Sequence, residues 1–258
     1  MSTISAAAVS ALRARTGVSI LACKEALEES GGDEEKAIEL LRKRGISQAA
    51  KKAERAQGEG KIFAAEADGK AAAVLLRCET DFVARADGFS ALGAELAAAL
   101  LQDGEAAAKT LADKKIPEAV QSLGENVSLG ELHLVTAPVV GTYVHSNGKI
   151  AVLVGLSKGS RDMARDVGMH AAAMSPQVVS PDEIAAESVE KEKEIWREQL
   201  KKEGKPEAMF DKIMLGKEKK FREENALLKQ AFVKDGQKTV EQYLDGAAVQ
   251  AYVRLSVA

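Results

Sequence analysis

The stretch KIFAAEADGKAAAVLLRC at residues 61–78 predicts a β-hairpin, and the rest of the fold can be worked out from it. Two apolar runs flank Asp68-Gly69, a dipeptide typical of tight turns because glycine tolerates the positive φ that such turns require. An apolar pattern with helical spacing follows at about residues 87–101. This part of the sequence therefore predicts two antiparallel strands followed by a helix.

The same order of patterns returns later in the chain. VVGTYVHSNGKIAVLVGL at residues 139–156 contains the turn dipeptide Asn147-Gly148, and a helical pattern follows at residues 161–174. The repetition predicts a duplicated α+β core in which each half is an antiparallel sheet covered on one face by helices.

Further segments complete the predicted core. A helical stretch near residues 116–123 and a strand at residues 127–135 lie between the two copies. A short helix at residues 238–244 precedes a last strand at residues 250–257, where apolar and polar residues alternate. This alternation predicts a strand with one buried face that closes the second half.

The N-terminal residues 1–45 predict three short helices. Glycines follow each apolar pattern, at Gly17, Gly31 and Gly45, and favour helix ends there. A bundle this small has a thin core, so we expect a docking module rather than a site of chemistry. Residues 48–60 are rich in Ala, Lys and Glu and predict a solvated helical connector.

Residues 182–228 predict an antiparallel coiled-coil hairpin. The segment is dense in Lys and Glu, and its apolar residues form two narrow seams with spacings of four and seven. The seams are Ala185, Val189, Trp196 and Leu200, then Phe210, Met214, Phe221 and Leu228. The predicted domains are a three-helix module with its linker (1–55), the first half of the core (56–138), the second half (139–181 and 229–258) and the inserted hairpin (182–228).

Composition excludes several classes of protein. The chain has 258 residues, of which 46% are hydrophobic, and a formal net charge of -3, so it should fold and has no overall attraction for nucleic acid or anionic lipid. Its two cysteines indicate a reducing compartment. We expect the cytoplasm, with an organelle matrix as the alternative because Arg13 and Arg15 precede the first acidic residue.

The sequence contains no recognisable catalytic or cofactor-binding pattern. Its three histidines, His133, His145 and His170, have no metal-ligand spacing, and no phosphate-binding glycine motif is present. We therefore predict no metal site and no cofactor of its own.

An unusual segment, ETDFV at residues 79–83, stands where a strand ends. In one interpretation Phe82 packs under the core while Thr80 and Asp81 cap a turn or the next helix. In the other, Asp81 and Phe82 point outward and enter a pocket of another protein. Spacing alone favours the first interpretation.

Two sets of residues resemble the elongation factor Ts family. The first set is Leu12-Arg13, Thr16-Gly17, Cys23-Lys24 and Ala26-Leu27; the second is Thr80, Asp81, Phe82, Val83 and Ala84. The resemblance covers nearly the whole chain in the same order. One departure is Leu75, five places before Thr80, where the family usually has an acid.

The resemblance implies a guanine-nucleotide exchange factor, and not an enzyme, that binds elongation factor Tu and promotes GDP release. The N-terminal module, with Arg13, Ile20, Leu21 and Lys24, would grip the GTPase domain. The exchange motif would be Thr80, Asp81, Phe82 and Val83, with Asp81 and Phe82 inserted beside the bound magnesium. The second half, with His145, Met169 and His170, would hold the other end of the partner.

The same resemblance implies that GDP and magnesium are bound by the partner, with no direct contact to nucleic acid or membrane, and it leaves open a dimer of the complex. Three other functions stay open from the residues. They are a scaffold that uses the three-helix module, of the ubiquitin-associated type, and the coiled coil; an enzyme that uses Cys78 or His145; and an RNA-binding protein that uses the Lys-rich hairpin. Interleaved acidic residues make that hairpin a poor phosphate-binding surface.

Overall fold

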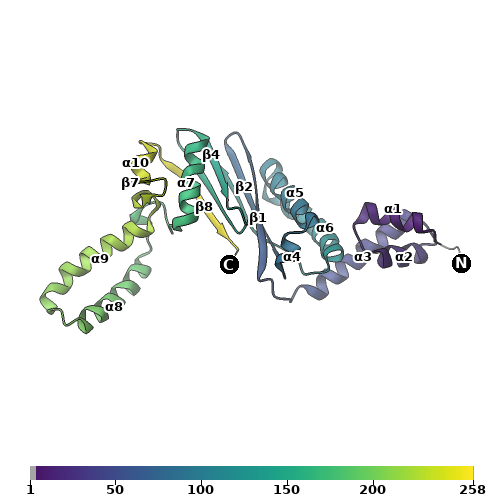
Figure 1. Ribbon diagram of the computed structural model, residues 1–258, viewed down its shortest axis with the longest axis horizontal. Coiled ribbons are helices and arrows are strands. Elements are labelled where there is room, and N and C mark those ends of the chain that lie inside the picture. Colours follow the sequence, from purple (N-terminus) through teal and green to yellow (C-terminus); the bar gives the residue numbers. More distant parts are fainter. Residues whose placement is uncertain (1–3, 258) are drawn as a thin grey trace. The chain divides into compact units, whose positions relative to one another are not determined.

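The computed structural model describes residues 4–257, so the first and last residues of the predicted ranges 1–55 and 229–258 lie outside the described part. The chain divides into two compact units. The first contains Met1–Leu134, Val144–Ala151 and Leu255–Ala258, and the second contains Val135–Tyr143 and Val152–Arg254. The course of the chain can be followed by colour in Figure 1.

The first unit begins with the three predicted helices: α1 (Ala6–Thr16), α2 (Ile20–Glu29) and α3 (Glu34–Lys52). A side-chain oxygen of Ser5, Ser19 or Asp33 accepts a backbone N–H at the start of each helix. The apolar residues of the three helices form one small core: Val9, Leu12, Val18, Cys23, Ala26, Leu27, Ala37 and Leu41. Within residues 4–257 no single helix is long and apolar enough to cross a membrane; α1 and α2 reach that length and composition only as a pair, which is bent by 112°.

The predicted end of the third helix at Gly45 is wrong, because α3 continues to Lys52. Gly45 is buried against the later helix α6 (Glu105–Leu123), and a Cβ atom placed on it would lie only 2.9 Å from the carbonyl oxygen of Pro117. This glycine therefore permits a close helix contact instead of ending the helix. Residues 48–52 of the predicted connector are accordingly the end of α3, and the helix does not continue through residues 53–60.

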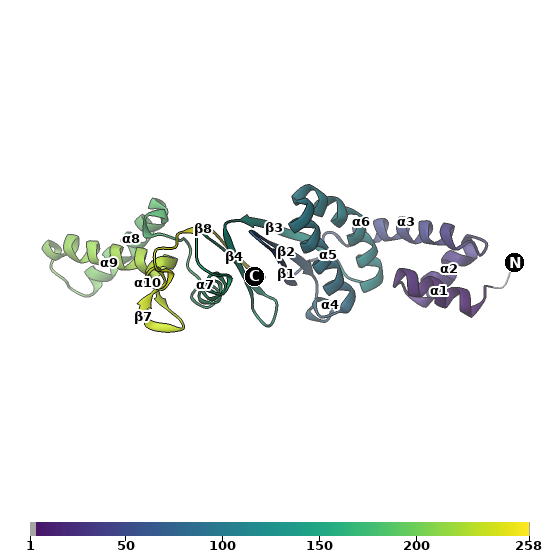
Figure 2. The same ribbon diagram turned by 90° about the horizontal axis from the view of Figure 1, so that it is seen from above.

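The first sheet has the strand order β1-β2-β3, formed by β1 (Glu59–Ala67), β2 (Lys70–Cys78) and β3 (Ser128–Thr136). β1 and β2 are antiparallel, and the predicted turn is confirmed, with Gly69 at φ 73°. The helices α5 (Asp87–Asp103) and α6 lie side by side (Figure 2), and α5 packs on β1 and β2. A one-turn helix, α4 (Asp81–Ala84), connects β2 to α5.

Helix α6 begins at Glu105, well before the predicted stretch near residues 116–123. The buried residues of its first half are small, Ala108 and Ala112, and Leu111 packs partly buried against the same core. Small apolar residues give a weak periodic signal, which explains the late predicted start.

The second sheet has the order β4-β5-β8, formed by β4 (Val139–Val144), β5 (Ile150–Leu156) and β8 (Val249–Ser256). The predicted helix after the second hairpin is α7 (Arg161–Met174), which follows β5 along the chain. The predicted one-sided burial of the last strand is only partly right. Gln250 and Ser256 are exposed as predicted, but two polar residues of β8 are partly covered: Tyr252 donates its hydroxyl hydrogen to the Pro176 carbonyl at 2.9 Å, and Arg254 donates to the Ala171 carbonyl at 3.3 Å.

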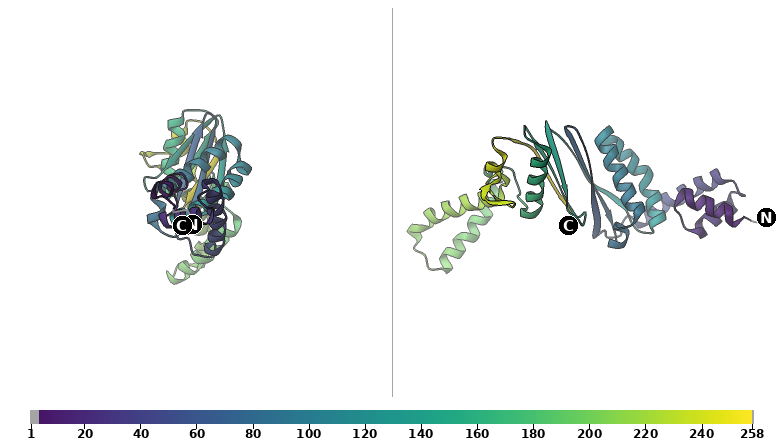
Figure 3. Two further views of the ribbon diagram at one scale, coloured as in Figure 1. Left: turned by 90° about the vertical axis from the view of Figure 1, so that its right-hand side faces the viewer. Right: turned by 45° about the horizontal axis from the view of Figure 1, so that its top comes forward.

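The hairpin of the second unit consists of α8 (Ala186–Lys202) and α9 (Phe210–Asn225), drawn as a helix pair in Figure 3. Its core contains Trp196, Leu200 and Met214, with Phe210, Ile213 and Phe221 around them. Lys193 joins the two helices through an ion pair with Glu218 at 2.9 Å.

Short elements surround the hairpin and lead back to the sheet. They are η1 (Pro181–Glu183), η2 (Glu207–Met209), η3 (Leu227–Lys229), β6 (Ala231–Phe232), β7 (Asp235–Thr239) and α10 (Val240–Leu244). The antiparallel pair of β6 and β7 is not in the sequence prediction. The predicted α+β fold with two sheet-and-helix halves and an inserted helical hairpin is confirmed.

Candidate functional site

The corner between β2 and α4 places Phe82 in solvent. Thr80 is the N-cap of α4, and its hydroxyl oxygen accepts the Val83 N–H at 3.4 Å. Because Val83 and Ala84 occupy the buried side of this single turn, Phe82 points away from the core and is 81% exposed. The interpretation in which Phe82 packs under the core is therefore wrong, while the predicted capping by Thr80 is confirmed.

Asp81 lies next to Phe82 and is half-buried. Its carboxylate forms an ion pair with Arg85, one turn further on, at 2.6 Å. An exposed pair of this kind is worth little to stability, so it leaves Asp81 free to exchange partners. The corner thus presents an aromatic ring beside a carboxylate.

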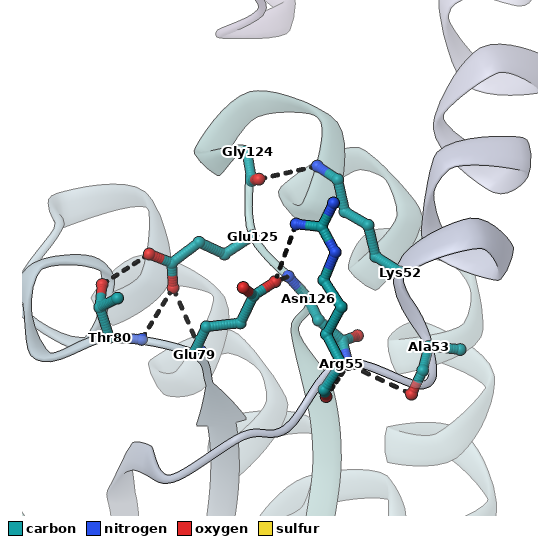
Figure 4. A network of polar contacts seen from close by, with 8 residues as sticks. All are labelled: Lys52, Ala53, Arg55, Glu79, Thr80, Gly124, Glu125 and Asn126. Carbon is teal, nitrogen blue, oxygen red and sulfur yellow. Dashed lines mark hydrogen bonds and ion pairs between the residues drawn. The ribbon is translucent and has the colours of Figure 1, made fainter.

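A polar network holds this corner from behind (Figure 4). The Glu125 carboxylate accepts the N–H groups of Glu79 and Thr80 at 3.1 and 3.0 Å and the Thr80 hydroxyl at 2.5 Å. In return, the Glu79 carboxylate accepts the Asn126 N–H at 2.6 Å. We call these four residues the clasp: Glu79, Thr80, Glu125 and Asn126.

The clasp is also tied to the segment that follows α3. The Asn126 side chain donates to the carbonyl oxygens of Ala53 and Arg55, at 3.3 and 3.1 Å, and the Arg55 side chain lies 3.4 Å from the Glu79 carboxylate. The Asn126 N–H, followed by the positive charge of Arg55, lowers the pKa of Glu79. Glu79 is therefore held as a carboxylate that accepts these bonds.

Sequence reasoning missed Glu125 and Asn126. The available signal is Gly124, which ends α6 in the left-handed conformation at φ 81° and is followed at once by an acid and an amide. Asn126 is only 5% exposed, and a buried amide is a strong sign of a hydrogen-bonded role. Nothing in the local sequence, however, shows that these residues meet a corner 45 positions earlier.

Cys78 lies at the same corner but is not a suitable nucleophile. Its thiol donates to the Thr80 carbonyl at 3.2 Å and is buried. Burial, together with the negative charges of Glu125 and Glu59, raises the pKa of the Cys78 thiol to about 11. A thiol that stays protonated at neutral pH is a poor nucleophile, which argues against an enzyme built on Cys78.

The predicted contact residues of the N-terminal module lie on its surface. Ile20 and Leu21 are 60% and 65% exposed at the start of α2. Arg13 is exposed on α1, and Lys24 is exposed with its ammonium 3.7 Å from Glu28. Two adjacent exposed apolar residues with flanking cations suit a protein-binding surface. This surface and Phe82 belong to different elements of the first unit.

The predicted contact role of His170 is wrong, because its side chain is completely buried. Its Nδ1 accepts the Val233 N–H at 3.2 Å, which leaves Nε2 to donate to the Gln230 side-chain oxygen at 2.9 Å. Burial lowers the pKa of His170 and favours this neutral form. Gln230 in turn donates to the Glu224 carbonyl on α9, so His170 supports the base of the hairpin. Met169 is half-buried and His145 is exposed at its hairpin turn.

Anchored, exposed apolar side chains of this kind are typical of the class of proteins that bind another macromolecule. In the described part of the chain no three His, Cys, Asp or Glu residues are placed to hold a metal ion. The comparisons with known proteins show the family.

The family model described as "Elongation factor TS" matches residues 79–258. Elongation factor Ts of Marinobacter nauticus is 42% identical over 265 residues, covering 100% of this chain and 92% of the relative. The proteins of the same name from Cellvibrio japonicus and Hydrogenobaculum sp. are 44% and 39% identical and cover 100% and 98% of this chain, and 91% and 98% of their own lengths. The chain belongs to the elongation factor Ts family, and its role lies in translation elongation.

Proposed function

We propose that this protein is a guanine-nucleotide exchange factor that binds elongation factor Tu and promotes the release of GDP, in the cytoplasm. The single observation that supports this most strongly is Phe82, 81% exposed on a corner that a polar network holds in place. Exposing a Phe side chain forgoes about 2 kcal/mol of burial free energy. A partner pocket that takes up the ring would recover this free energy.

In the proposed mechanism, Asp81 and Phe82 enter the partner next to its magnesium and phosphate site. The carboxylate and the ring displace side chains that support the metal, which weakens the grip on GDP. The factor itself makes and breaks no bond and carries no cofactor. Because coupling free energies are reciprocal, a factor that prefers the nucleotide-free partner must weaken nucleotide binding to the same extent.

The other surfaces supply binding energy for this step. Ile20 and Leu21, flanked by Arg13 and Lys24, would bind the GTPase domain through the N-terminal module. His145 and Met169 would contact the partner from the second half. A coupling of about 4 kcal/mol corresponds to a thousandfold change in nucleotide affinity, which an interface of ordinary size can supply.

The experiment is to measure the release of fluorescent GDP from elongation factor Tu by stopped flow. With the double variant Asp81→Ala, Phe82→Ala, GDP should leave elongation factor Tu about a hundredfold more slowly than with the wild type, because both inserted side chains are lost. Leu215→Ala is the matched control, since Leu215 is also an exposed apolar residue, at 70%, but lies on the hairpin. Its rate should stay within about twofold of the wild type.

Wild-type release rates in the double variant, with normal binding to elongation factor Tu, would disprove the role of Asp81 and Phe82. Thermal unfolding should be unchanged in both variants, because neither Phe82 nor Leu215 contributes to a core.

A further inference from the structure

The exchange motif lies on a helix that is too short to be stable by itself. α4 has only four residues, and an isolated turn of helix is unstable in water because nucleation costs more than one hydrogen bond returns. The N–H groups of Glu79 and Thr80 lie beyond β2, which ends at Cys78. Packing of Val83 and Ala84 sets the side of the turn that Phe82 faces, but the turn itself must be held by groups outside it.

We propose that Glu125 is a positioning residue for nucleotide exchange, which holds Asp81 and Phe82 in the orientation that enters the partner. This inference rests on the proposed exchange function. Glu125 comes from the loop between α6 and β3 and reaches the corner from another part of the fold.

The geometry of the carboxylate supports this role. One oxygen of Glu125 accepts both backbone N–H groups, and the other accepts the Thr80 hydroxyl. That acceptance fixes the direction of the hydroxyl hydrogen, so the lone pairs of the Thr80 oxygen are left to receive the Val83 N–H. Hydrogen bonds to an ionised acceptor are about twice as strong as neutral ones. Glu125 thus fixes the conformation of the backbone before α4 and the orientation of the Thr80 hydroxyl that caps the helix.

The loop that carries Glu125 is itself held in place. Asn126 donates its N–H to Glu79, so residues 79–80 and 125–126 bind each other in both directions. Lys52 donates to the Gly124 carbonyl at 2.8 Å, and the Asn126 side chain bonds to the chain after α3. A fixed anchor on each side makes Glu125 a rigid support for the corner.

Two variants separate positioning from space filling. Glu125→Ala removes all three acceptor bonds and should lower the GDP release rate at saturating factor by about tenfold, because the corner then spends less time in the competent orientation. Glu125→Gln has the same shape, and its carbonyl oxygen can keep the two N–H bonds while its NH2 group cannot accept the Thr80 hydroxyl. The GDP release rate with Glu125→Gln should lie between the rates with Glu125→Ala and with the wild type. The half-saturating concentration should change by less than about twofold, because the N-terminal surface is intact.

The control is Glu131→Ala, which removes an exposed acid from the neighbouring strand β3. The GDP release rate with this variant should equal the rate with the wild type. A double-mutant cycle with Phe82→Ala then identifies the route of action. If Glu125 works by orienting Phe82, Glu125→Ala should slow exchange much less in the Phe82→Ala background than in the wild type. Fully additive effects would overturn the proposal.

A measurement without the partner completes the test. Amide hydrogen exchange of a peptide covering residues 79–85 should be about tenfold faster in Glu125→Ala, with the rest of the first unit protected as before. Unchanged exchange of these amides, or a Glu125→Ala variant that releases GDP as fast as the wild type, would overturn the positioning role alone. If the wild-type protein releases no GDP from elongation factor Tu, the proposed function is wrong, whatever the amide exchange shows.

Discussion

In the first half of the core β2 leads into α4 through Thr80, and in the second half β5 leads into α7 through Ser160. Both hydroxyl oxygens accept the N–H three residues further on, at 3.4 Å in the first half and 3.1 Å in the second. α7 then continues for 14 residues, and Asp162 stands two places after its cap. α4 ends after 4 residues, and Phe82 stands at the corresponding place.

The comparison separates what folding requires from what it does not. A capped corner after a strand serves the fold in both halves. The exposed ring of Phe82 and the Glu125 carboxylate that accepts the Thr80 hydroxyl both occur at the first corner. The second corner folds without them. We therefore attribute the exposed ring of Phe82 to function, and Glu125 to holding the short helix that carries the ring.

Among single substitutions, the largest effect should come from removing the ring at the first corner. Phe82→Ala should slow GDP release by about thirtyfold, because an aromatic anchor in a partner pocket carries much of the binding energy. The matched change at the second corner, Asp162→Ala, should leave the rate within about twofold. Stopped-flow release of fluorescent GDP measures the rate with each variant. If Phe82→Ala and Asp162→Ala slowed release equally, the first corner would have no special role in exchange.

The two caps should respond differently to loss of the hydroxyl. Ser160→Ala should destabilise the protein by about 1 kcal/mol and leave exchange unchanged, since only a helix cap is lost. Thr80→Val should cost about as much stability and also slow exchange about tenfold, because the bond to Glu125 is lost as well. Urea unfolding and GDP release on the same samples provide the comparison. A Thr80→Val protein that exchanges normally would contradict it.

Shortening the hairpin should have a smaller effect. Replacing residues 194–217 by a short Gly-Ser turn keeps the ion pair between Lys193 and Glu218, which lies midway along the two helices, and removes the half of each helix that is nearer the turn. GDP release should slow by less than about threefold, because the hairpin carries few groups suited to a nucleotide site. Complete loss of exchange, with the core still folded by circular dichroism, would show that the hairpin is central.

The smallest effect should be a difference in pH dependence between the halves. Burial lowers the pKa of His170 below its ordinary value of 6.5, so its contribution to stability is complete above pH 6.5 and declines as the pH falls below it. The pKa of Glu79 is lowered from 4.5, so its contribution persists above that pH and is lost only as the pH falls through the folded-state pKa. Amide exchange followed from about pH 7 to about pH 4 should show the second half loosening first.

Trp196 gives an independent signal for the same experiment. It is the single tryptophan of the chain and lies in the hairpin of the second unit, whose base His170 supports. Its fluorescence transition in urea should shift to lower urea as the pH drops from about 7 to about 5. A transition that does not move in this interval would exclude a role for His170 in the pH dependence.

Much of this fold could be predicted from sequence because its signals are local. Asp68-Gly69 and Asn147-Gly148 mark turns within a few residues, and the heptad-like seams mark the hairpin helices. The late start predicted for α6 comes from a weak local signal, whereas the errors at Gly45 and in β8 come from long-range contacts. Gly45 was predicted as a helix end because only the packing of α3 on α6 shows that the glycine is a contact point.

The candidate site divides along the same line. The residue types in ETDFV predict a cap but leave two orientations for Phe82, and spacing alone favours the buried one. The burial of Val83 and Ala84 is what turns the ring outward. Glu125 could not be found from sequence because its partners are at positions 79 and 80. His170 was assigned to the surface although the chain after the hairpin covers it, through Gln230 and Val233.

Calorimetric titration tests the central claim most directly, by comparing the affinity of this protein for nucleotide-free and GDP-loaded elongation factor Tu. The account predicts that the nucleotide-free form binds about a thousandfold more tightly, which is the coupling needed to drive GDP out. Equal affinity for the two forms would contradict the account, because a factor without a preference cannot shift the partner toward release.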